Sequence, residues 1–430
     1  MRSAHRVVAM LAILSLVSIA EGKERAHLAA LQSIQADELL AHVEVLADDA
    51  YEGRASGSRG GRAAAAYLVG RLEEMGVAGG AAGGGYYQPF SRGRRNVLAQ
   101  FPGDDSPDAD PNLSKEWIVV GAHYDHVGYG DSRTSFGPIG YIHNGADDNA
   151  SGVAALLEFC EAMTTGDLRF RRSVLVAFWD GEEVGMLGSQ HWMRQPTVPV
   201  QDVRLSINID MVGRLREGRI ELAGTRTGYG LRRLASVVHD PEVWLDFTWV
   251  LEPNSDHWTF ISRGVPTLML HTGLHDNYHR PSDDVETLNI EGIRTVSRYL
   301  FDLVSTAADA PALPQPRRQG RTESASLQKS RERLLPPLPE NTPPPRVGLA
   351  WREDQAEPGS VFLTRVVANS PADTAGLQPL DRVLAIDGEA FTNSADFEQR
   401  LQASLAADAE EILLLVERRG RVEPAIVRPN

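Results

Sequence analysis

The sequence contains a single cysteine, Cys160, among its 430 residues. One thiol excludes an intramolecular disulfide, a four-cysteine zinc site and a two-cysteine redox pair. Cys160 and the apolar residues Val153, Leu156 and Leu157 are spaced as residues on one face of a helix are. That spacing predicts a thiol packed in a core rather than a nucleophile.

The chain also lacks the excess of positive charge that nucleic-acid binding requires. Lysine and arginine together number 43, against 58 aspartate and glutamate residues, which gives a formal net charge of -15. A basic patch or stripe is the electrostatic footprint of a nucleic-acid surface, so no nucleic-acid partner is expected. With 42% hydrophobic and 23% charged residues, the composition is that of a folded protein.

Long apolar runs are absent except at the very start of the chain. Residues 7–20 are apolar or small, follow a basic start at Arg2, His5 and Arg6, and end in Ser18-Ile19-Ala20. The run is too short to span a bilayer comfortably. The pattern predicts a secretory signal peptide over residues 1–20, with an uncleaved anchor as the alternative. We therefore expect an exported protein, periplasmic or extracellular, with no membrane span after signal cleavage.

A segment rich in proline and arginine, residues 311–345, divides the remainder of the chain. Proline stiffens the backbone, and the segment has too few apolar residues to form a core. It predicts a linker that is extended in part; an ordered arm packed on one domain is the alternative. The linker separates a large domain, residues 21–310, from a small domain, residues 346–430.

The large domain alternates short apolar runs with helical stretches. Such runs suit strands that are buried on both faces of a sheet. The runs lie at residues 117–120, 174–179, 205–209 and 267–270, and helices are expected over residues 38–46 and 61–75. The alternation predicts the α/β class, with a mostly parallel central sheet covered by helices on both faces.

Acidic and histidine side chains follow each of the four predicted strands. In open α/β sheets, ligands bind outside the carboxyl ends of the strands. The side chains are His123 and Asp125 after the first strand, Glu182 and Glu183 after the second, Asp210 after the third, and Tyr278 and His279 in the loop after the fourth; Asp148 precedes a helix. The sequence thus predicts one site to which five segments contribute.

The chemistry of these residue types points to a metal centre. Several carboxylates gathered without arginines would repel one another strongly unless a divalent cation lay between them. Imidazole with carboxylate and no thiolate suits zinc, with manganese or cobalt as alternatives. Two histidines and three carboxylates suffice for two metals if one carboxylate bridges. The alternative is a set of ordinary helix caps and surface acids at loop ends.

These segments resemble the five motifs of the co-catalytic di-zinc aminopeptidases of metallopeptidase family 28. The motifs are Gly121–His126, Asn144–Gly152, Phe178–Gly185, Asn208–Gly213 and Tyr278–Asp284, in the order found in the family. The resemblance runs from about Leu39 to Leu303. It implies the zinc-peptidase fold and two Zn2+ per chain.

The resemblance also implies a role for each site residue. One zinc would be held by Asp148, Glu183 and His279, and the other by Asp148, His123 and Asp210, so that Asp148 bridges. Glu182 matches the general base, Asp125 matches the carboxylate that orients His123, and Tyr278 matches a position that stabilises the oxyanion in some relatives. His126 is expected to line the site or to have a structural role.

The function implied is an exported metallopeptidase that removes N-terminal residues from peptide or protein substrates. A metal-activated water would attack the peptide carbonyl, with Glu182 taking its proton. The alternatives are a carboxypeptidase of the same fold, a glutaminyl-cyclase-like acyltransferase that needs one metal, and a peptide-binding scaffold without activity.

The small domain resembles a bacterial-type PDZ domain, which is small and rich in β-strands. Ser370-Pro371-Ala372 predicts a helix start, Asp381–Gly388 a strand and tight turn, and Arg346–Leu349 the carboxylate-binding loop. The resemblance implies binding of peptide or protein C-termini as an added strand. The alternative is a degenerate groove on a domain that only packs against the peptidase.

Overall fold

The computed structural model describes residues 22–430 apart from residues 108, 167, 237–241, 340–341 and 344. The predicted signal peptide, residues 1–20, lies outside the described residues. None of the described helices is both long and apolar enough to cross a bilayer. The chain forms two compact units. The first comprises the described residues up to Val203 with Ile209–Arg214 and Leu274–Asp309; the second comprises Arg204–Asn208, Leu215–Gly273 and Ala310–Asn430.

The first unit is built on two parallel strands, β4 (Trp117–His123) and β5 (Ser173–Trp179). Every residue of β5 is buried, as its continuous apolar sequence predicts. The register pairs His123 with Trp179, so the carboxyl ends of both strands lie at the same edge. On the other side of β5 runs β3 (Arg95–Phe101), antiparallel, which carries the short strands β1 (Ala78–Gly79) and β2 (Tyr87–Pro89).

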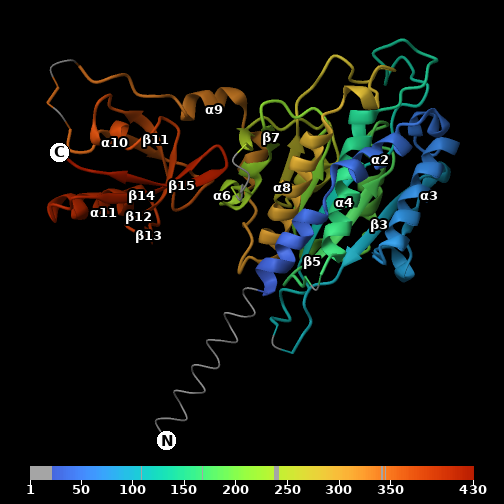
Figure 1. The fold of residues 1–430 in the computed structure, drawn as a ribbon, viewed down its shortest axis with the longest axis horizontal. Helices are drawn as coiled ribbons and strands as arrows, with labels where there is room; N and C mark the ends of the chain where they lie inside the picture. The colour runs from blue at the N-terminus through green and yellow to red at the C-terminus, as the bar shows by residue number, and fades with distance from the viewer. Residues whose placement is uncertain (1–21, 108, 167, 237–241, 340–341, 344) are drawn as a thin grey trace, which may run out of the picture. The chain divides into compact units, whose positions relative to one another are not determined.

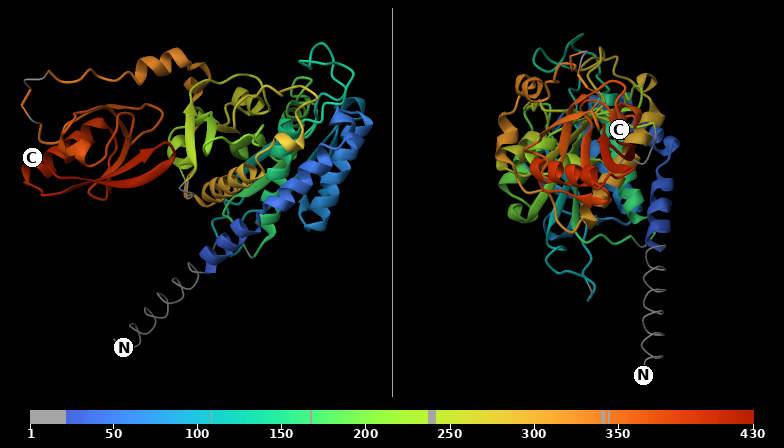
Figure 2. Two further views of the ribbon diagram at one scale, coloured as in Figure 1. Left: turned by 45° about the horizontal axis from the view of Figure 1, so that its top comes forward. Right: turned by 90° about the vertical axis from the view of Figure 1, so that its left-hand side faces the viewer.

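Helices cover these strands. Figures 1 and 2 show α2 (Ala36–Leu46), α4 (Gly152–Thr164) and α8 (Ile290–Asp309) side by side, and they pack against one another. Helix α3 (Arg59–Glu74) packs on β3 and α4, and α5 (Leu187–Arg194) packs on β3. Cys160 is fully buried in α4, where burial raises the pKa of its thiol. It is a packed thiol, as its spacing predicted.

The second unit contains the remaining strands of the large domain, in the order β6-β9-β7-β8. Their bounds are Val203–Ile209 for β6, Arg219–Ala223 for β7, Trp244–Thr248 for β8 and Thr267–His271 for β9; the helices here are α6 (Leu231–Ala235) and α7 (His257–Arg263). Strands β7 and β8 are parallel, whereas β7 and β9 are antiparallel. The α/β class is confirmed, with both parallel and antiparallel pairs among its described strands. The short turn between β2 and β3 accounts for one antiparallel pair, because it reverses the chain.

The small domain forms a separate antiparallel sheet in the second unit. Its strand order is β10-β11-β12-β14-β15, with β13 paired to β12. The bounds are Leu349–Glu353 for β10, Val361–Val366 for β11, Arg382–Ile386 for β12, Glu389–Ala390 for β13, Ile412–Arg418 for β14 and Arg421–Val427 for β15, with helices α10 (Pro371–Thr374) and α11 (Ser394–Ala406). The predicted β-rich domain is confirmed.

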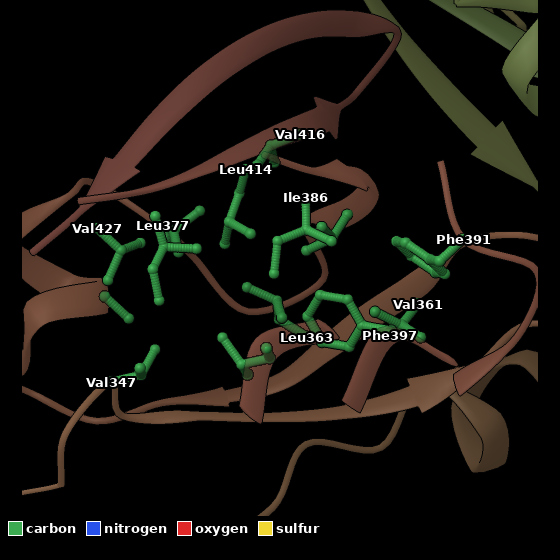
Figure 3. Packing of buried hydrophobic residues seen from close by; sticks show 14 of the residues in the cluster. Val347, Val361, Leu363, Leu377, Ile386, Phe391, Phe397, Leu414, Val416 and Val427 are labelled. Atoms are coloured by element: carbon green, nitrogen blue, oxygen red, sulfur yellow. The ribbon is translucent and has the colours of Figure 1, made fainter. Parts of the chain in front are cut away.

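A compact apolar core holds this domain together. Figure 3 shows Val361 and Leu363 beside Phe397 of α11, with Leu414 pointing into the same core. The helix start predicted at Ser370 is present, because its hydroxyl accepts the N–H of Asp373 at 3.3 Å.

The segment rich in proline and arginine is partly ordered and packed within the second unit. It contains the short helices η8 (Arg318–Thr322) and α9 (Ala325–Arg331). Its Glu323 accepts hydrogen bonds from Arg226, which also donates to Asp354 of the small domain at 2.7 and 3.0 Å. These residues fit the alternative of an ordered arm packed on one domain, because their charges pair with buried partners instead of water. The domain boundaries themselves stay predictions.

Asp354→Asn should lower the free energy of unfolding by about 3 kcal/mol, because removing one partner of a buried ion pair leaves the other charge uncompensated. Both Arg226 and Arg382 donate to this carboxylate. Urea unfolding of the full chain measures the change. The matched control is Glu411→Gln, which breaks an ion pair whose side chains are 52% and 70% exposed. It should cost about 0.5 kcal/mol or less. Equal, small losses in both variants would show that the Arg226–Asp354 contact does not stabilise the unit.

Candidate metal centre

All five predicted metal ligands come together in the first unit. They form two groups of donor atoms, each within a span that one metal ion could fill: His123, Asp148 and Asp210 in one, and His126, Asp148, Glu183 and His279 in the other. His123 ends β4, and Glu183 lies just beyond β5, so the shared edge of the two parallel strands brings them near each other. The ligand roles stay predictions.

Asp148 belongs to both groups and offers a different oxygen to each. Its Oδ1 lies 3.3 Å from Nε2 of His123, and its Oδ2 lies 3.1 Å from Nε2 of His279. The side chain is almost fully buried. A carboxylate that bridges two metal ions needs this arrangement.

The spacing of the other donor atoms fits zinc. His123 Nε2 is 3.4 Å from Asp210 Oδ1, and His279 Nε2 is 3.1 Å from Glu183 Oε2. Zinc bonds of about 2.0–2.1 Å at tetrahedral angles separate neighbouring ligand atoms by about 3.3 Å. Imidazole nitrogens and carboxylate oxygens without a thiolate are also a zinc donor set. The residues present therefore fit the metal that the sequence predicts.

The backbone that carries Asp148 is held by a second buried carboxylate. Oδ2 of Asp283 accepts the N–H groups of Asp147 at 3.1 Å and of Asp148 at 3.0 Å. Burial, together with the charge of Asp147, raises the pKa of Asp283. Arg214 approaches the other oxygen of Asp283 at 3.4 Å. The peptide bond that follows Asp148 is cis. Asp283 thus fixes the backbone at Asp148 and with it the direction in which the Asp148 side chain points.

A buried arginine stands beside the acids, which corrects the expectation of carboxylates without an arginine. Arg54 is fully buried, and its guanidinium donates to the backbone oxygens of Tyr124 at 2.9 Å and Gly145 at 2.9 Å. These two carbonyls belong to the segments that carry His123 and Asp148. Burial lowers the pKa of Arg54 to about 10, against the opposing effect of Asp148. Arg54 therefore stays a cation at neutral pH and ties the two ligand segments together.

Asp125 contacts the loop of the predicted base more closely than it contacts His123. Its Oδ1 accepts the backbone N–H of Glu182 at 3.0 Å. The imidazole Nδ1 of His123 lies 3.1 Å from the backbone oxygen of Asp125 but 3.9 Å from Oδ1. Burial and the charge of Asp180 raise the pKa of Asp125 well above its ordinary value. The predicted roles of Asp125 and Glu182 stay predictions.

Tyr278 lies against His279, the predicted ligand that follows it. Its ring stacks on that of His279 with centroids 3.9 Å apart and planes 27° apart. Burial and the charge of Asp148 raise the pKa of Tyr278, so the phenol keeps its proton at neutral pH. His279 has a left-handed backbone, with φ of 52°, and its carbonyl accepts the N–H of Phe136 at 3.0 Å. Strained backbone of this kind gathers at functional sites.

The negative charges of the buried carboxylates need positive charge beside them. Burial alone would lower the pKa of His279, but Asp148 and Glu183 raise it to about 10. Burial opposes protonation of His123 too, yet Asp210 and Asp148 raise its pKa well above the ordinary value. Burial would raise the pKa of Asp148, but hydrogen bonds from the two histidines hold it well below its usual range. In the metal-free protein, protons on the two histidines thus supply the positive charge that metal ions would otherwise supply.

Sequence reasoning gave no role to Arg54 and Asp283, which the structure places at the site, and only a general lining or structural role to His126. Arg54 lies in no motif, and its bonds to backbone oxygens leave no pattern in the sequence. Asp283 lies within a motif, but which groups it would hold does not follow from its position. His126 ends the His-Tyr-Asp-His string and is fully buried, with Nδ1 2.8 Å from Oε1 of Glu183.

Comparison with known families supports the assignment of both domains. Residues 96–304 match the model of peptidase family M28, and residues 362–418 match the model of the PDZ domain.

Similar proteins include several aminopeptidases. Probable leucine aminopeptidase 2 of Aspergillus fumigatus is 26% identical over 52% of this chain and 46% of its own length. Leucine aminopeptidase 1 of Grosmannia clavigera is 29% identical over 46% of this chain and 47% of its own length. The chain therefore spans about half the length of these relatives.

Solved structures share the fold. The LapA aminopeptidase of Legionella pneumophila aligns with a TM-score of 0.55 at 19% identity, over 67% of this chain and 75% of that one. A zinc aminopeptidase of Bacillus subtilis aligns with a TM-score of 0.51 at 14% identity, over 65% of this chain and 97% of that one. At such identities the likeness concerns the fold alone. Together with the two donor groups that share Asp148, the family matches identify residues 96–304 as a domain of peptidase family M28 and residues 362–418 as a PDZ domain.

Proposed function

We propose that this chain is a zinc aminopeptidase with two Zn2+ per chain. The observation that carries the proposal is that Asp148 presents one oxygen to each of two donor groups. When bound, zinc lowers the pKa of a water molecule and polarises a substrate carbonyl. Similarity to aminopeptidases supports the reaction class.

The chain's own residues supply the proton transfers and the orientation. Glu182 accepts the proton of the attacking water and returns it to the leaving amine. The hydrogen bond from its backbone N–H to Asp125 fixes the loop that carries it. The phenol of Tyr278 keeps its proton and donates a hydrogen bond to the oxygen of the scissile carbonyl, where negative charge develops.

An apolar side chain beside the metal centre supports an apolar N-terminal residue in the substrate. Phe136 is 61% exposed, although its ring lies 5.6 Å from that of Tyr278 and 5.8 Å from that of His279. An exposed apolar ring beside a site is more informative than one elsewhere on the surface.

The alternatives differ in metal content. A glutaminyl-cyclase-like enzyme of related fold needs one metal, so the donor group that contains His123 and Asp210 would hold none. Zinc analysis of the purified chain should give two ions per chain for a hydrolase; one would favour the cyclase and none the scaffold. A carboxypeptidase would also hold two ions, so only its substrates separate it from an aminopeptidase.

We also propose that the chain is exported and loses residues 1–20. The basic start, the apolar run and the small residues at its end support this. Mass spectrometry of the mature N-terminus tests it, since an intact Met1 in the exported protein would contradict cleavage.

The PDZ domain is proposed to bind a free peptide C-terminus along β10. This strand lies at an edge of its sheet. Trp351 of β10 donates from its indole to Ser394 Oγ at 3.1 Å and packs edge-on against Phe397, so it bounds the space between β10 and α11. A peptide added to the free edge would gain main-chain hydrogen bonds.

Glu182→Gln should lower kcat/KM on a leucine anilide with a free amino group by about 100-fold or more, because an amide cannot accept the proton of water. Zinc content should stay at the wild-type level. The matched control, Glu183→Gln, should lose zinc and activity together. Activity of Glu182→Gln within about tenfold of wild type would refute the base assignment.

Faster cleavage of an N-acetylated or C-terminal substrate by the wild type would overturn aminopeptidase action.

Zinc affinity should rise with pH, because His123 and His279 must lose protons to become ligands. With a pKa of about 10, His279 is protonated at neutral pH in the metal-free protein. Each proton released should strengthen binding by about tenfold per pH unit. Calorimetry in two buffers of different ionisation enthalpy counts these protons. Binding without proton release would contradict the charge balance described for the site.

A peptide that ends in an apolar residue with a free carboxylate should bind the full chain at least about tenfold more tightly than the same peptide with an amidated C-terminus. The reason is that the predicted carboxylate-binding loop, Arg346–Leu349, would capture the carboxylate. Fluorescence anisotropy with the Glu182→Gln protein measures this without cleavage. Equal affinity for both peptides would indicate a groove that does not read C-termini.

A further inference from the structure

His126 is a fully buried histidine that the proposed reaction does not use. It follows β4, three residues after His123, and its Nδ1 lies 2.8 Å from Oε1 of Glu183. The ring has little freedom: a side chain at Gly145 would meet it at 2.5 Å, and the ring of His279 packs edge-on at 5.6 Å. Its orientation toward Glu183 is therefore built into the fold.

The two oxygens of Glu183 have different neighbours. Oε2 lies 3.1 Å from Nε2 of His279, whereas Oε1 is taken by His126. A carboxylate that ligates zinc is ionised and has no proton to donate. The hydrogen on this bond must therefore sit on Nδ1 of His126, which donates to Glu183.

The distances favour a hydrogen bond over direct ligation by His126. The Nδ1 to Oε1 separation of 2.8 Å is shorter than the separation of about 3.3 Å between neighbouring ligand atoms of tetrahedral zinc. A nitrogen that carries the hydrogen of this bond has no lone pair left for a metal. The other oxygen in reach, Oδ2 of Asp148, is more distant, at 3.7 Å.

We propose that His126 is a positioning residue for the zinc site of Asp148, Glu183 and His279. By donating to Oε1, His126 leaves only Oε2 of Glu183 for the metal. The hydrogen bond also fixes the orientation of the Glu183 carboxylate before zinc binds. The inference rests on the proposed zinc site but not on the proposed substrate. Loss of an outer partner of this kind typically weakens metal binding by about 10–100-fold.

Two substitutions separate the hydrogen bond from the shape of the side chain. His126→Phe keeps a ring but loses the donor, and His126→Asn keeps an N–H group near the place of Nδ1. Chelator competition with Zn2+ on the full chain should show one of the two zinc ions bound about 10–100-fold more weakly in His126→Phe. His126→Asn should recover most of that loss. The control His42→Phe removes a buried histidine that bonds Tyr67 and belongs to neither donor group, and it should bind zinc as the wild type does.

Several outcomes would overturn the proposal. Unchanged zinc affinity in His126→Phe, or equal losses in the Phe and Asn variants, would exclude a role for the donated hydrogen bond. X-ray absorption of the zinc-loaded protein should count the same number of histidines per zinc in wild type and His126→Phe; a lower count in the variant would make His126 a ligand.

A measurement on the wild type covers the case in which the variants fail to fold. Nitrogen NMR of labelled histidines in the zinc-loaded protein should show His126 with its hydrogen on Nδ1, and a hydrogen on Nε2 alone would contradict the proposal. If the wild type bound no zinc, the proposed metal site itself would fail, whereas zinc binding without peptidase activity would leave the role of His126 standing.

Discussion

The electrostatic cost of burying several carboxylates in one place is the constraint on which the site depends. Asp148, Glu183 and Asp125 are almost withdrawn from water, and an ionised acid in such surroundings needs a partner. The surrounding structure supplies what the acids require. His123 and His279 face their oxygens, Arg54 adds a fixed cation, and divalent metal ions would complete the balance.

The segments that carry the predicted ligands are held through backbone groups more than through pairs of side chains. Arg54 donates to carbonyl oxygens on both ligand segments, and Asp283 accepts two consecutive N–H groups beside Asp148. Such bonds fix where a segment runs and not only where one side chain lies. They fix the segments of the candidate metal site at the edge shared by β4 and β5. The same need for pairing recurs in the second unit, where Arg226 joins Glu323 and Asp354.

Sequence reasoning found the residues of the two donor groups because their positions follow from simple rules. Apolar runs marked the strands, and His123, Glu183 and Asp210 came directly after them, so their convergence at one edge could be expected. The order of the motifs then identified the family. Arg54 escaped notice because bonds to carbonyl oxygens leave no residue pattern, and the partners of Asp283 and His126 depend on loop conformation that spacing does not encode.

The segment rich in proline and arginine left two alternatives open for a similar reason. Composition could not decide between a partly extended linker and an ordered arm, because it cannot show that Glu323 faces Arg226, a residue far away in the sequence. Long-range ion pairs decide whether a polar segment is free or packed. The strand directions were likewise only partly predictable, since the direction of pairing depends on turns such as that between β2 and β3.

The central claim is that Asp148 bridges two zinc sites. Diffraction from zinc-loaded crystals, measured at wavelengths on either side of the zinc absorption edge, tests it most directly. The account predicts two anomalous peaks, one among Asp148, His123 and Asp210 and one among Asp148, Glu183 and His279. A single peak, or peaks at which Asp148 is not a shared ligand, would contradict it.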